Sequence, residues 1–134
     1  MRAVPVVERT RPRVLVIDDE PRVRQMVCAS LGDLGYHAEG AANGADGLAL
    51  LEHQGYDLIL TDLGMPGMTG WEVAEGVQRR APGLSVILIS GSATERDEDQ
   101  ARNRGVWLLR KPIDMQDLEK AVNQALRGEP EGGC

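Results

Sequence analysis

Runs of consecutive apolar residues alternate along the chain with longer segments in which apolar residues recur every three or four positions. An uninterrupted apolar run is typical of a parallel strand that helices cover on both faces of its sheet. Four runs predict such strands, at residues 14–17, 58–60, 86–89 and 106–109. A fifth strand is expected at residues 36–41 on grounds of topology, because Glu39 and Gly40 have weak strand propensity.

The segments between the strands have helical spacing. The first helix begins at Pro21, a favoured first helical residue, and Gly32 and Gly35 flank its expected end. The segment 93–104 is so polar that we expect a marginally stable, largely solvated helix. The other helices are predicted at residues 44–53 and 70–80 and between Asp114, a suitable N-cap, and Gly128.

The order of these elements is a strand followed by a helix, repeated five times. Right-handed crossovers then produce a doubly wound parallel sheet with helices on both faces, and one of its two usual strand orders is the flavodoxin-like order 2-1-3-4-5. We expect one domain over residues 13–127, with flexible tails at residues 1–12 and 128–134 that are rich in Pro, Arg, Gly and Glu.

Composition narrows the class of protein. The 134 residues are 42% hydrophobic and 27% charged, which suits one globular domain. A formal net charge of -6 argues against direct nucleic-acid binding. The chain lacks both a membrane-length apolar run and a signal peptide, so we expect a cytoplasmic protein without membrane contact. Cys28 and Cys134 lack metal-site spacing, and Cys28 is expected in the core.

Polar residues that could bind a ligand or take part in a reaction follow the predicted strands. Ligands of doubly wound sheets bind outside the carboxyl ends of the strands, so these residues share one rim. Each alone is an ordinary turn, cap or solvated residue, and their combination at that rim predicts a functional site. They are Asp18, Asp19 and Glu20 after the first strand, Asp62 after the third, Ser90 after the fourth, and Lys111 and Pro112 after the fifth.

The acidic members of this set predict a cation site. With strand order 2-1-3-4-5, Asp18, Asp19 and Asp62 leave adjacent strands, and carboxylates that close repel one another unless a cation neutralises them. Oxygen ligands without Cys or His favour Mg²⁺, with Mn²⁺ as a possible substitute. A cation, the Lys111 ammonium and the Ser90 hydroxyl together form a cradle for phosphoryl oxygens around a carboxylate nucleophile.

Four motifs give the chain a family resemblance over residues 13–127. They are the segment 14–21 with its Asp-Asp-Glu-Pro end, the segment 62–70, Ser90-Gly91 and Lys111-Pro112. With these motifs the chain resembles the receiver domain of two-component response regulators. The resemblance implies a flavodoxin-like (βα)₅ fold with a doubly wound, five-stranded parallel sheet in the order 2-1-3-4-5. It also implies that Asp62 accepts a phosphoryl group from a phosphohistidine.

The same resemblance implies roles for the remaining site residues. Asp19, Asp62 and the backbone carbonyl of Gly64 would hold Mg²⁺, and Asp18 would act mainly through water. Ser90 and Lys111 would each bind a phosphoryl oxygen. Pro112 would follow a cis peptide bond that directs Lys111 into the site.

The chain departs from the family pattern at two positions. Leu108 stands where the family usually has a Tyr or Phe switch side chain, and its neighbour Trp107 is expected to pack in or beside the core. Gly64 stands where larger side chains are common, and we hypothesise that its lack of a side chain gives water access and shortens the phosphorylated lifetime. Nearby Met65, Met68 and Trp71 form either a docking patch or the edge of the core.

As a receiver, the protein would be a signalling domain, with self-phosphorylation from small donors and self-dephosphorylation as its only reactions. Its expected partners are a sensor histidine kinase or phosphotransfer protein and an unidentified downstream protein, because no segment after Arg127 could fold as an output domain. We expect a monomer or a weak phosphorylation-dependent dimer.

Other functions remain to be weighed. The chain could be the C-terminal receiver of a hybrid histidine kinase, since residues 4–8 look like the end of a kinase ATPase domain. A Mg²⁺-dependent phosphatase with an Asp nucleophile would carry Asp-x-Asp after its first strand, whereas Asp18 and Asp19 are adjacent. A nucleotide-binding module would need a Gly-rich turn there. A receiver that works without phosphorylation is disfavoured because the full set of site residues is present.

Overall fold

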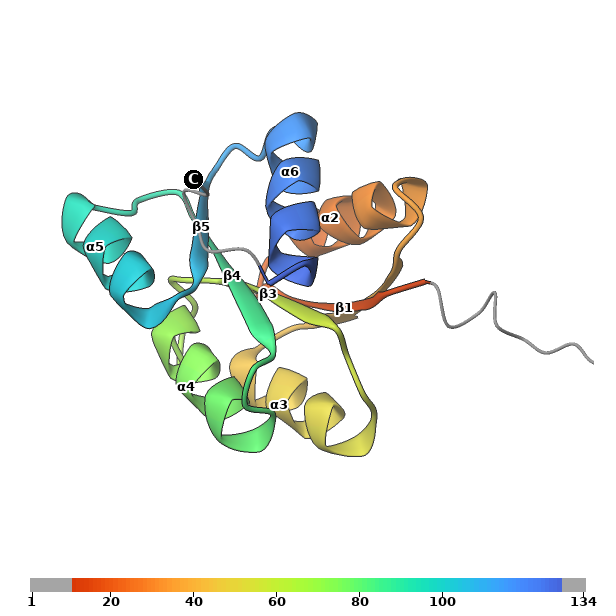
Figure 1. Cartoon of the computed structure of the whole chain (residues 1–134), viewed down its shortest axis with the longest axis horizontal. Coiled ribbons are helices and arrows are strands. Elements are labelled where there is room, and N and C mark those ends of the chain that lie inside the picture. The colour runs from red at the N-terminus through yellow and green to blue at the C-terminus, as the bar shows by residue number, and fades with distance from the viewer. Residues whose placement is uncertain (1–10, 129–134) are drawn as a thin grey trace, which may run out of the picture.

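The computed structural model describes residues 11–128, so the expectations for residues 1–10 and 129–134 lie outside the described part. The sheet has five parallel strands in the order β2-β1-β3-β4-β5, which confirms the predicted flavodoxin-like topology (Figure 1). The strands are β1 (Arg13–Ile17), β2 (His37–Ala41), β3 (Leu58–Asp62), β4 (Ser85–Ser90) and β5 (Trp107–Arg110).

Five helices occur in the described part of the chain, one after each strand. Figure 1 shows α2 and α6 on one face of the sheet and α3 and α4 on the other, with α5 beside β5. The helices are α2 (Pro21–Asp33), α3 (Gly44–His53), α4 (Gly70–Arg80), α5 (Glu95–Arg104) and α6 (Met115–Leu126). None of the helices between residues 11 and 128 combines the length and the apolar character that a membrane span requires.

Side-chain caps fix where several helices begin. Asp114 accepts hydrogen bonds from the amides of Gln116 and Asp117, which confirms it as the N-cap of α6. The helix α5 begins at Glu95, two residues later than the prediction, because Thr94 and Asp97 form a capping box. Local capping chemistry therefore overrides hydropathy at the start of a helix that has little apolar surface to bury.

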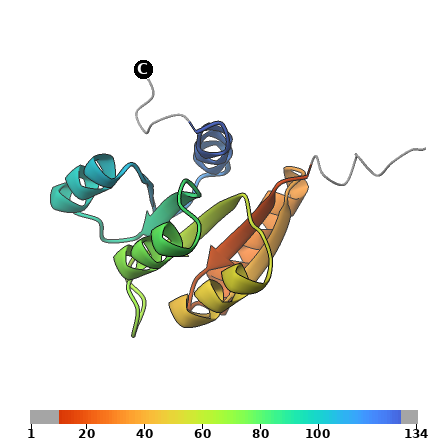
Figure 2. The ribbon, with the colours of Figure 1, turned by 60° about the horizontal axis from the view of Figure 1, so that its bottom comes forward.

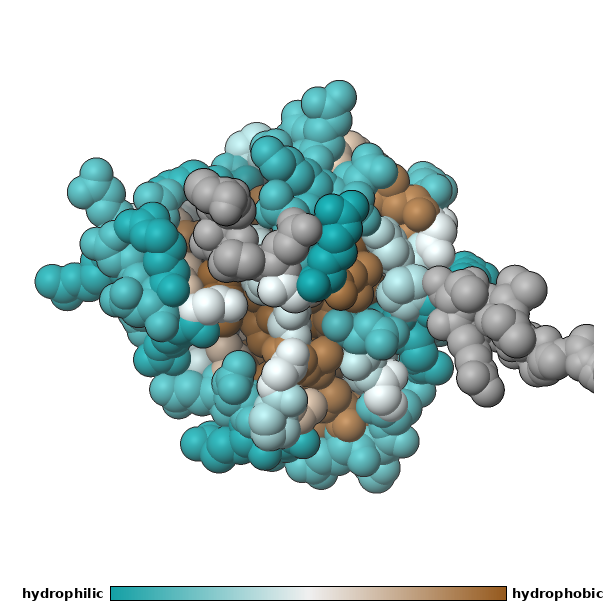
Figure 3. Space-filling view, viewed as in Figure 1, coloured by the Kyte–Doolittle hydropathy of each residue, from teal (hydrophilic) through white to brown (hydrophobic). Residues whose placement is uncertain are grey.

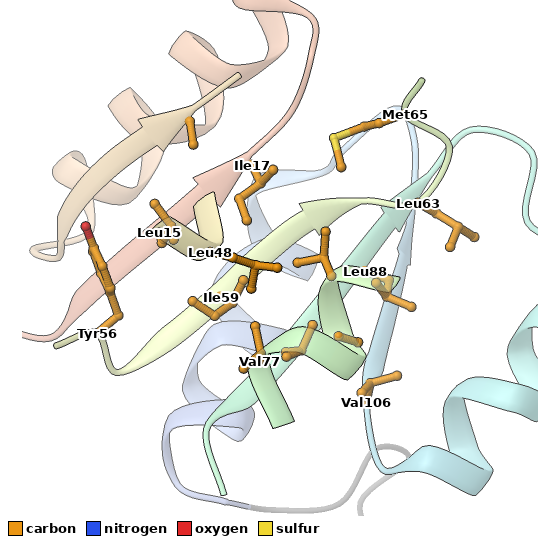
Figure 4. Close-up of a cluster of buried hydrophobic side chains, with 14 of the residues drawn as sticks. Leu15, Ile17, Leu48, Tyr56, Ile59, Leu63, Met65, Val77, Leu88 and Val106 are labelled. Atoms are coloured by element: carbon orange, nitrogen blue, oxygen red, sulfur yellow. The ribbon is translucent and has the colours of Figure 1, made fainter. Parts of the chain in front are cut away.

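The core consists of two apolar layers, one on each face of the sheet. Figure 4 shows the layer between the sheet and α3 and α4, where Leu15, Ile59 and Leu88 from three strands meet Leu48 and Val77 from the helices. The opposite layer packs β1, β3, β4 and β5 against α2 and α6. Strands buried on both faces in this way explain why their sequences are apolar without alternation.

The two layers show where Trp107, Cys28 and the residues around Met65 lie relative to the core. Trp107 is 5% exposed and packs in the layer beneath α6, as predicted, while Leu108 packs partly buried on the opposite face. Cys28 is half-buried beside the α6 layer, less deep than the core position expected for it. Met65 is buried, and Met68 and Trp71 pack against the layer between the sheet and α3 and α4. These positions favour the interpretation of the three residues as the edge of the core over that of a docking patch.

Candidate functional site

The parallel register brings the carboxyl ends of β1, β3 and β4 to one edge of the sheet. Ile17 pairs with Thr61, so Asp18 and Asp62 lie at the ends of neighbouring strands. Asp62 pairs with Ile89 on its other side, next to Ser90. Strand order and register together thus gather residues that are up to 93 positions apart in the chain, from Asp18 to Lys111.

Three carboxylates converge at this edge. Asp18, Asp19 and Asp62 each offer an oxygen, and these oxygens all lie within 4.8 Å of one another. Asp18 and Asp62 are buried, whereas Asp19 is exposed. A group of hard oxygen ligands at this spacing fits a divalent cation such as Mg²⁺, which also relieves the repulsion among the three carboxylates.

Lys111 faces the carboxylates from the end of β5. Its Nζ lies 3.2 Å from Asp62 Oδ1, 3.8 Å from Asp18 Oδ2 and 3.5 Å from Glu20 Oε1. Its backbone amide donates to the carbonyl of Ser90 at 2.9 Å, which continues the sheet past the last residue of β5. The peptide bond between Lys111 and Pro112 is cis, as the family resemblance implied.

Burial and charge shift the protonation equilibria of two site residues. Burial raises the pKa of Asp18 above its ordinary value, against the opposing effects of the Glu20 amide and the Lys111 ammonium. Burial alone would lower the pKa of Lys111, but the carboxylates of Asp62 and Asp18 more than offset it, and its pKa is raised. Lys111 is therefore a firmly held positive charge beside Asp62.

Ser90 completes one wall of an open cleft. Its hydroxyl oxygen accepts a hydrogen bond from the amide of Ser92 at 3.1 Å, and the residue is 4% exposed. The cleft has a volume of about 330 Å³. It is lined by Asp19, Glu20, Asp62, Gly64, Ser90, Gly91, Ser92 and Lys111.

Two glycines shape the segment that follows Asp62. A Cβ on Gly64 would meet no heavy atom within 4 Å, so this wall of the cleft is open. A Cβ on Gly70 would lie 2.7 Å from the carbonyl oxygen of Asp62, and only glycine lets the start of α4 approach the end of β3 so closely. The amide of Gly70 also donates to the carbonyl of Leu63 at 2.8 Å, closing the loop after Asp62.

Sequence reasoning placed Glu20 at this rim without its contacts, and it missed Ser92. Glu20 holds Asp18 through its backbone amide, which donates to Oδ1 at 2.9 Å, and contacts Lys111 through its side chain. Ser92 binds Ser90. These contacts depend on loop geometry, which the hydropathy pattern does not reveal.

Comparisons with known proteins identify the family of the chain. The model of the response regulator receiver domain matches residues 14–123. Protein PilH of Pseudomonas aeruginosa is 31% identical over 119 residues, which cover 87% of this chain and 98% of PilH. The transcriptional regulatory protein GlrR of Escherichia coli is 32% identical over 114 residues, which are 84% of this chain and only 26% of GlrR.

Solved structures give the same result for the fold. The chemotaxis protein CheY4 of Vibrio cholerae superposes with a TM-score of 0.80 at 28% identity, covering 87% of this chain and 99% of CheY4. A response regulator receiver domain protein from Clostridium thermocellum reaches a TM-score of 0.81, also at 28% identity, over 87% of this chain and 94% of that one. The chain belongs to the response regulator receiver domain family.

Proposed function

We propose that Asp62 accepts a phosphoryl group from the phosphohistidine of a sensor histidine kinase or phosphotransfer protein. The observation that carries this proposal is the position of Asp62 between a fixed ammonium, with Lys111 Nζ at 3.2 Å, and the two further carboxylates of a cation site. A carboxylate in such surroundings can meet an anionic phosphoryl donor without net repulsion.

The transfer is an in-line displacement at phosphorus. A carboxylate oxygen of Asp62 forms a bond to phosphorus as the bond from phosphorus to the histidine nitrogen breaks, and the electron pair of that bond returns to the imidazole. The Lys111 ammonium and the Ser90 hydroxyl bind two of the phosphoryl oxygens that carry the charge. The product is an acyl phosphate, which water can hydrolyse, so the signal is transient.

The proposed site for Mg²⁺, or for Mn²⁺ as a substitute, is formed by Asp18, Asp19, Asp62 and the carbonyl of Gly64. The bound cation supplies charge neutralisation for the incoming phosphoryl oxygens. The carboxylate spacing of 4.8 Å or less supports this assignment, because ligand oxygens around one Mg²⁺ ion must lie close together.

The proposal is tested by treating the protein with acetyl phosphate and Mg²⁺ and measuring its intact mass. We expect one added phosphoryl group that is lost in acid and in base, and that the Asp62→Ala variant does not acquire. Asp57→Ala is a matched control, because Asp57 precedes β3 at the other end of that strand. Equal phosphorylation of Asp62→Ala and the parent would refute Asp62 as the acceptor.

A second setting for the same domain is a hybrid kinase. The sensor histidine kinase RcsC of Escherichia coli is 28% identical over 110 residues, covering 81% of this chain and 12% of RcsC. In either setting Asp62 performs the same chemistry, and the difference lies in whether the donor histidine belongs to the same polypeptide. The Asp-nucleophile phosphatase is not favoured, because the family match covers most of the chain.

A further inference from the structure

The side chain of Arg24, at the end of the first turn of α2, turns back toward the site. Its Nη1 donates a hydrogen bond to the backbone carbonyl oxygen of Asp18 at 2.7 Å. The amide of Arg24 donates to the carbonyl of Glu20 at 2.9 Å. One residue therefore holds both ends of the short segment that carries the aspartate pair.

The contact with Arg24 fixes a particular peptide plane. The amide of Asp18 donates to the carbonyl of Ala41 at 3.1 Å, and its carbonyl accepts from Arg24. That carbonyl belongs to the peptide bond between Asp18 and Asp19. Because the Asp19 side chain is exposed, the backbone that carries it decides where its carboxylate lies.

A second observation comes from Gly40 in the edge strand β2. A Cβ added there would lie 3.0 Å from both Cγ and Cδ of Arg24. The apolar stem of Arg24 thus lies across β2 at the position where the strand has no side chain. Glycine inside a strand often marks such a close approach, and the weak strand propensity of this position has here a structural reason.

We propose that Arg24 is a positioning residue for the cation site: its guanidinium fixes the Asp18–Asp19 peptide so that the Asp19 carboxylate meets those of Asp18 and Asp62, and Gly40 provides the space it needs. The inference rests on the proposed function, because it assumes that these carboxylates hold Mg²⁺. Arg24 contacts neither the cation nor the phosphoryl group and acts through the backbone.

The test is a calorimetric titration of the protein with Mg²⁺ alone. Arg24→Gln is expected to weaken Mg²⁺ affinity about tenfold, the usual effect of removing a group that orients a metal ligand. Arg22→Gln is the matched control, because it removes the same charge from an exposed position two residues away on the same helix. It is expected to change the affinity much less than Arg24→Gln does.

Two further variants separate positioning from general stability. Arg24→Lys keeps a stem and one donor and should restore part of the affinity. Gly40→Val leaves Arg24 in place but fills the space of its stem, so it should weaken Mg²⁺ binding as Arg24→Gln does. The double variant should lose no more affinity than either single variant, since both act on one contact. Thermal unfolding midpoints show whether each variant is folded.

The outcomes distinguish this inference from the proposed function. A parent protein that binds no Mg²⁺, or an Asp19→Asn variant that binds it as well as the parent, would contradict the proposed cation site itself. If the parent binds Mg²⁺ and Asp19→Asn does not, unchanged affinity in Arg24→Gln would overturn the role of Arg24. Equal weakening by Arg22→Gln and Arg24→Gln would overturn it too, because charge alone would then explain the effect.

Discussion

At the scale of a single residue, Gly64 leaves open space beside Asp62, the proposed phosphoacceptor. It lines the cleft beside Asp62, and a Cβ there would meet nothing within 4 Å. The first atom of a larger side chain therefore has room, and under our hypothesis that side chain would restrict the approach of water to the acyl phosphate. We expect Gly64→Met to slow the loss of the phosphoryl group severalfold with little change in stability.

The decay of the phosphorylated protein after removal of the donor measures this effect, by intact mass at successive times. Gly55→Met is a suitable control, because a Cβ at Gly55 also meets open space but the residue lies outside the cleft. Decay of Gly64→Met that equals or exceeds the parental rate would show that water access is not limited by this position.

The main site residues that sequence reasoning found lie at strand ends or directly after them. Asp62, Ser90 and Lys111 could be predicted because an apolar run ends at a polar residue, and parallel strands end at one rim. The part played by Arg24 could not, because an arginine early in an amphipathic helix is usually a solvated charge. Its contact with Asp18 depends on β2 having a glycine at position 40, and only the assembled sheet brings the two together.

Among the five helices of the described residues, α5 has the fewest buried residues. Ala101 is its buried residue, and Figure 2 shows α5 standing at the edge of the molecule beside β5. The same side of the molecule in Figure 3 is covered by hydrophilic side chains. Polar contacts must therefore supply much of what holds α5 in place.

Arg110 supplies such contacts from the residue before Lys111. Its Nη1 donates to the carbonyl of Ala93 at 2.7 Å, and its Nε and Nη2 donate to Glu98 Oε2 at 3.0 and 2.5 Å. We expect Arg110→Gln to accelerate amide hydrogen exchange in α5 by up to about fivefold, the equivalent of a surface ion pair worth about 1 kcal/mol. Exchange in α6 should stay at the parental rate.

Hydrogen exchange read by mass spectrometry resolves the two helices. Arg102→Gln serves as the comparison, because Arg102 pairs with Asp99 inside α5 and does not bridge to β5. Similar acceleration in both variants would mean that α5 depends on its own helical stability and not on the contact with Arg110.

Element boundaries were predictable where a local signal coincided with the hydropathy pattern. Pro21 and Asp114 mark the starts of α2 and α6, and both helices begin as expected. For α5 the apolar pattern is too weak to locate the first turn, and the capping box of Thr94 decides it. The strand β2 was placed by topology more than by composition, since its polar residue Glu39 serves contacts with other elements.

At the scale of the whole molecule, the end of the sheet opposite the cleft carries a polar network. Glu39 on β2 accepts a hydrogen bond from the Tyr56 hydroxyl at 2.5 Å and one from Arg13 at 2.8 Å. The hydrogen bond from Tyr56 is the main cause that lowers the pKa of Glu39. Burial and the same hydrogen bond raise the pKa of Tyr56 to about 12.

These shifts make the stability of the fold depend on pH at both extremes. Because the pKa of Glu39 is lowered in the folded protein, Glu39 contributes to the free energy of unfolding at pH values above its pKa in the unfolded chain. This contribution is lost as the pH falls through its pKa in the folded protein. The raised pKa of Tyr56 means that its contribution is complete below about pH 10, the unfolded value. That contribution is lost as the pH rises toward about 12.

Tyr56→Phe should therefore lower the free energy of unfolding at neutral pH by about 1.5–3 kcal/mol, the range for a hydrogen bond to a charged group. The variant should also lose stability less steeply than the parent at low pH, because the pKa of Glu39 then lies nearer its unfolded value. Urea unfolding at a series of pH values measures both effects. Tyr36→Phe is the control, because the Tyr36 hydroxyl donates to the neutral amide oxygen of Asn123 at 2.7 Å. Removing that hydroxyl should leave the loss of stability at low pH as steep as in the parent. If stability falls equally steeply at low pH in Tyr56→Phe and in the parent, then His37 and Arg13, rather than Tyr56, hold the pKa of Glu39 low.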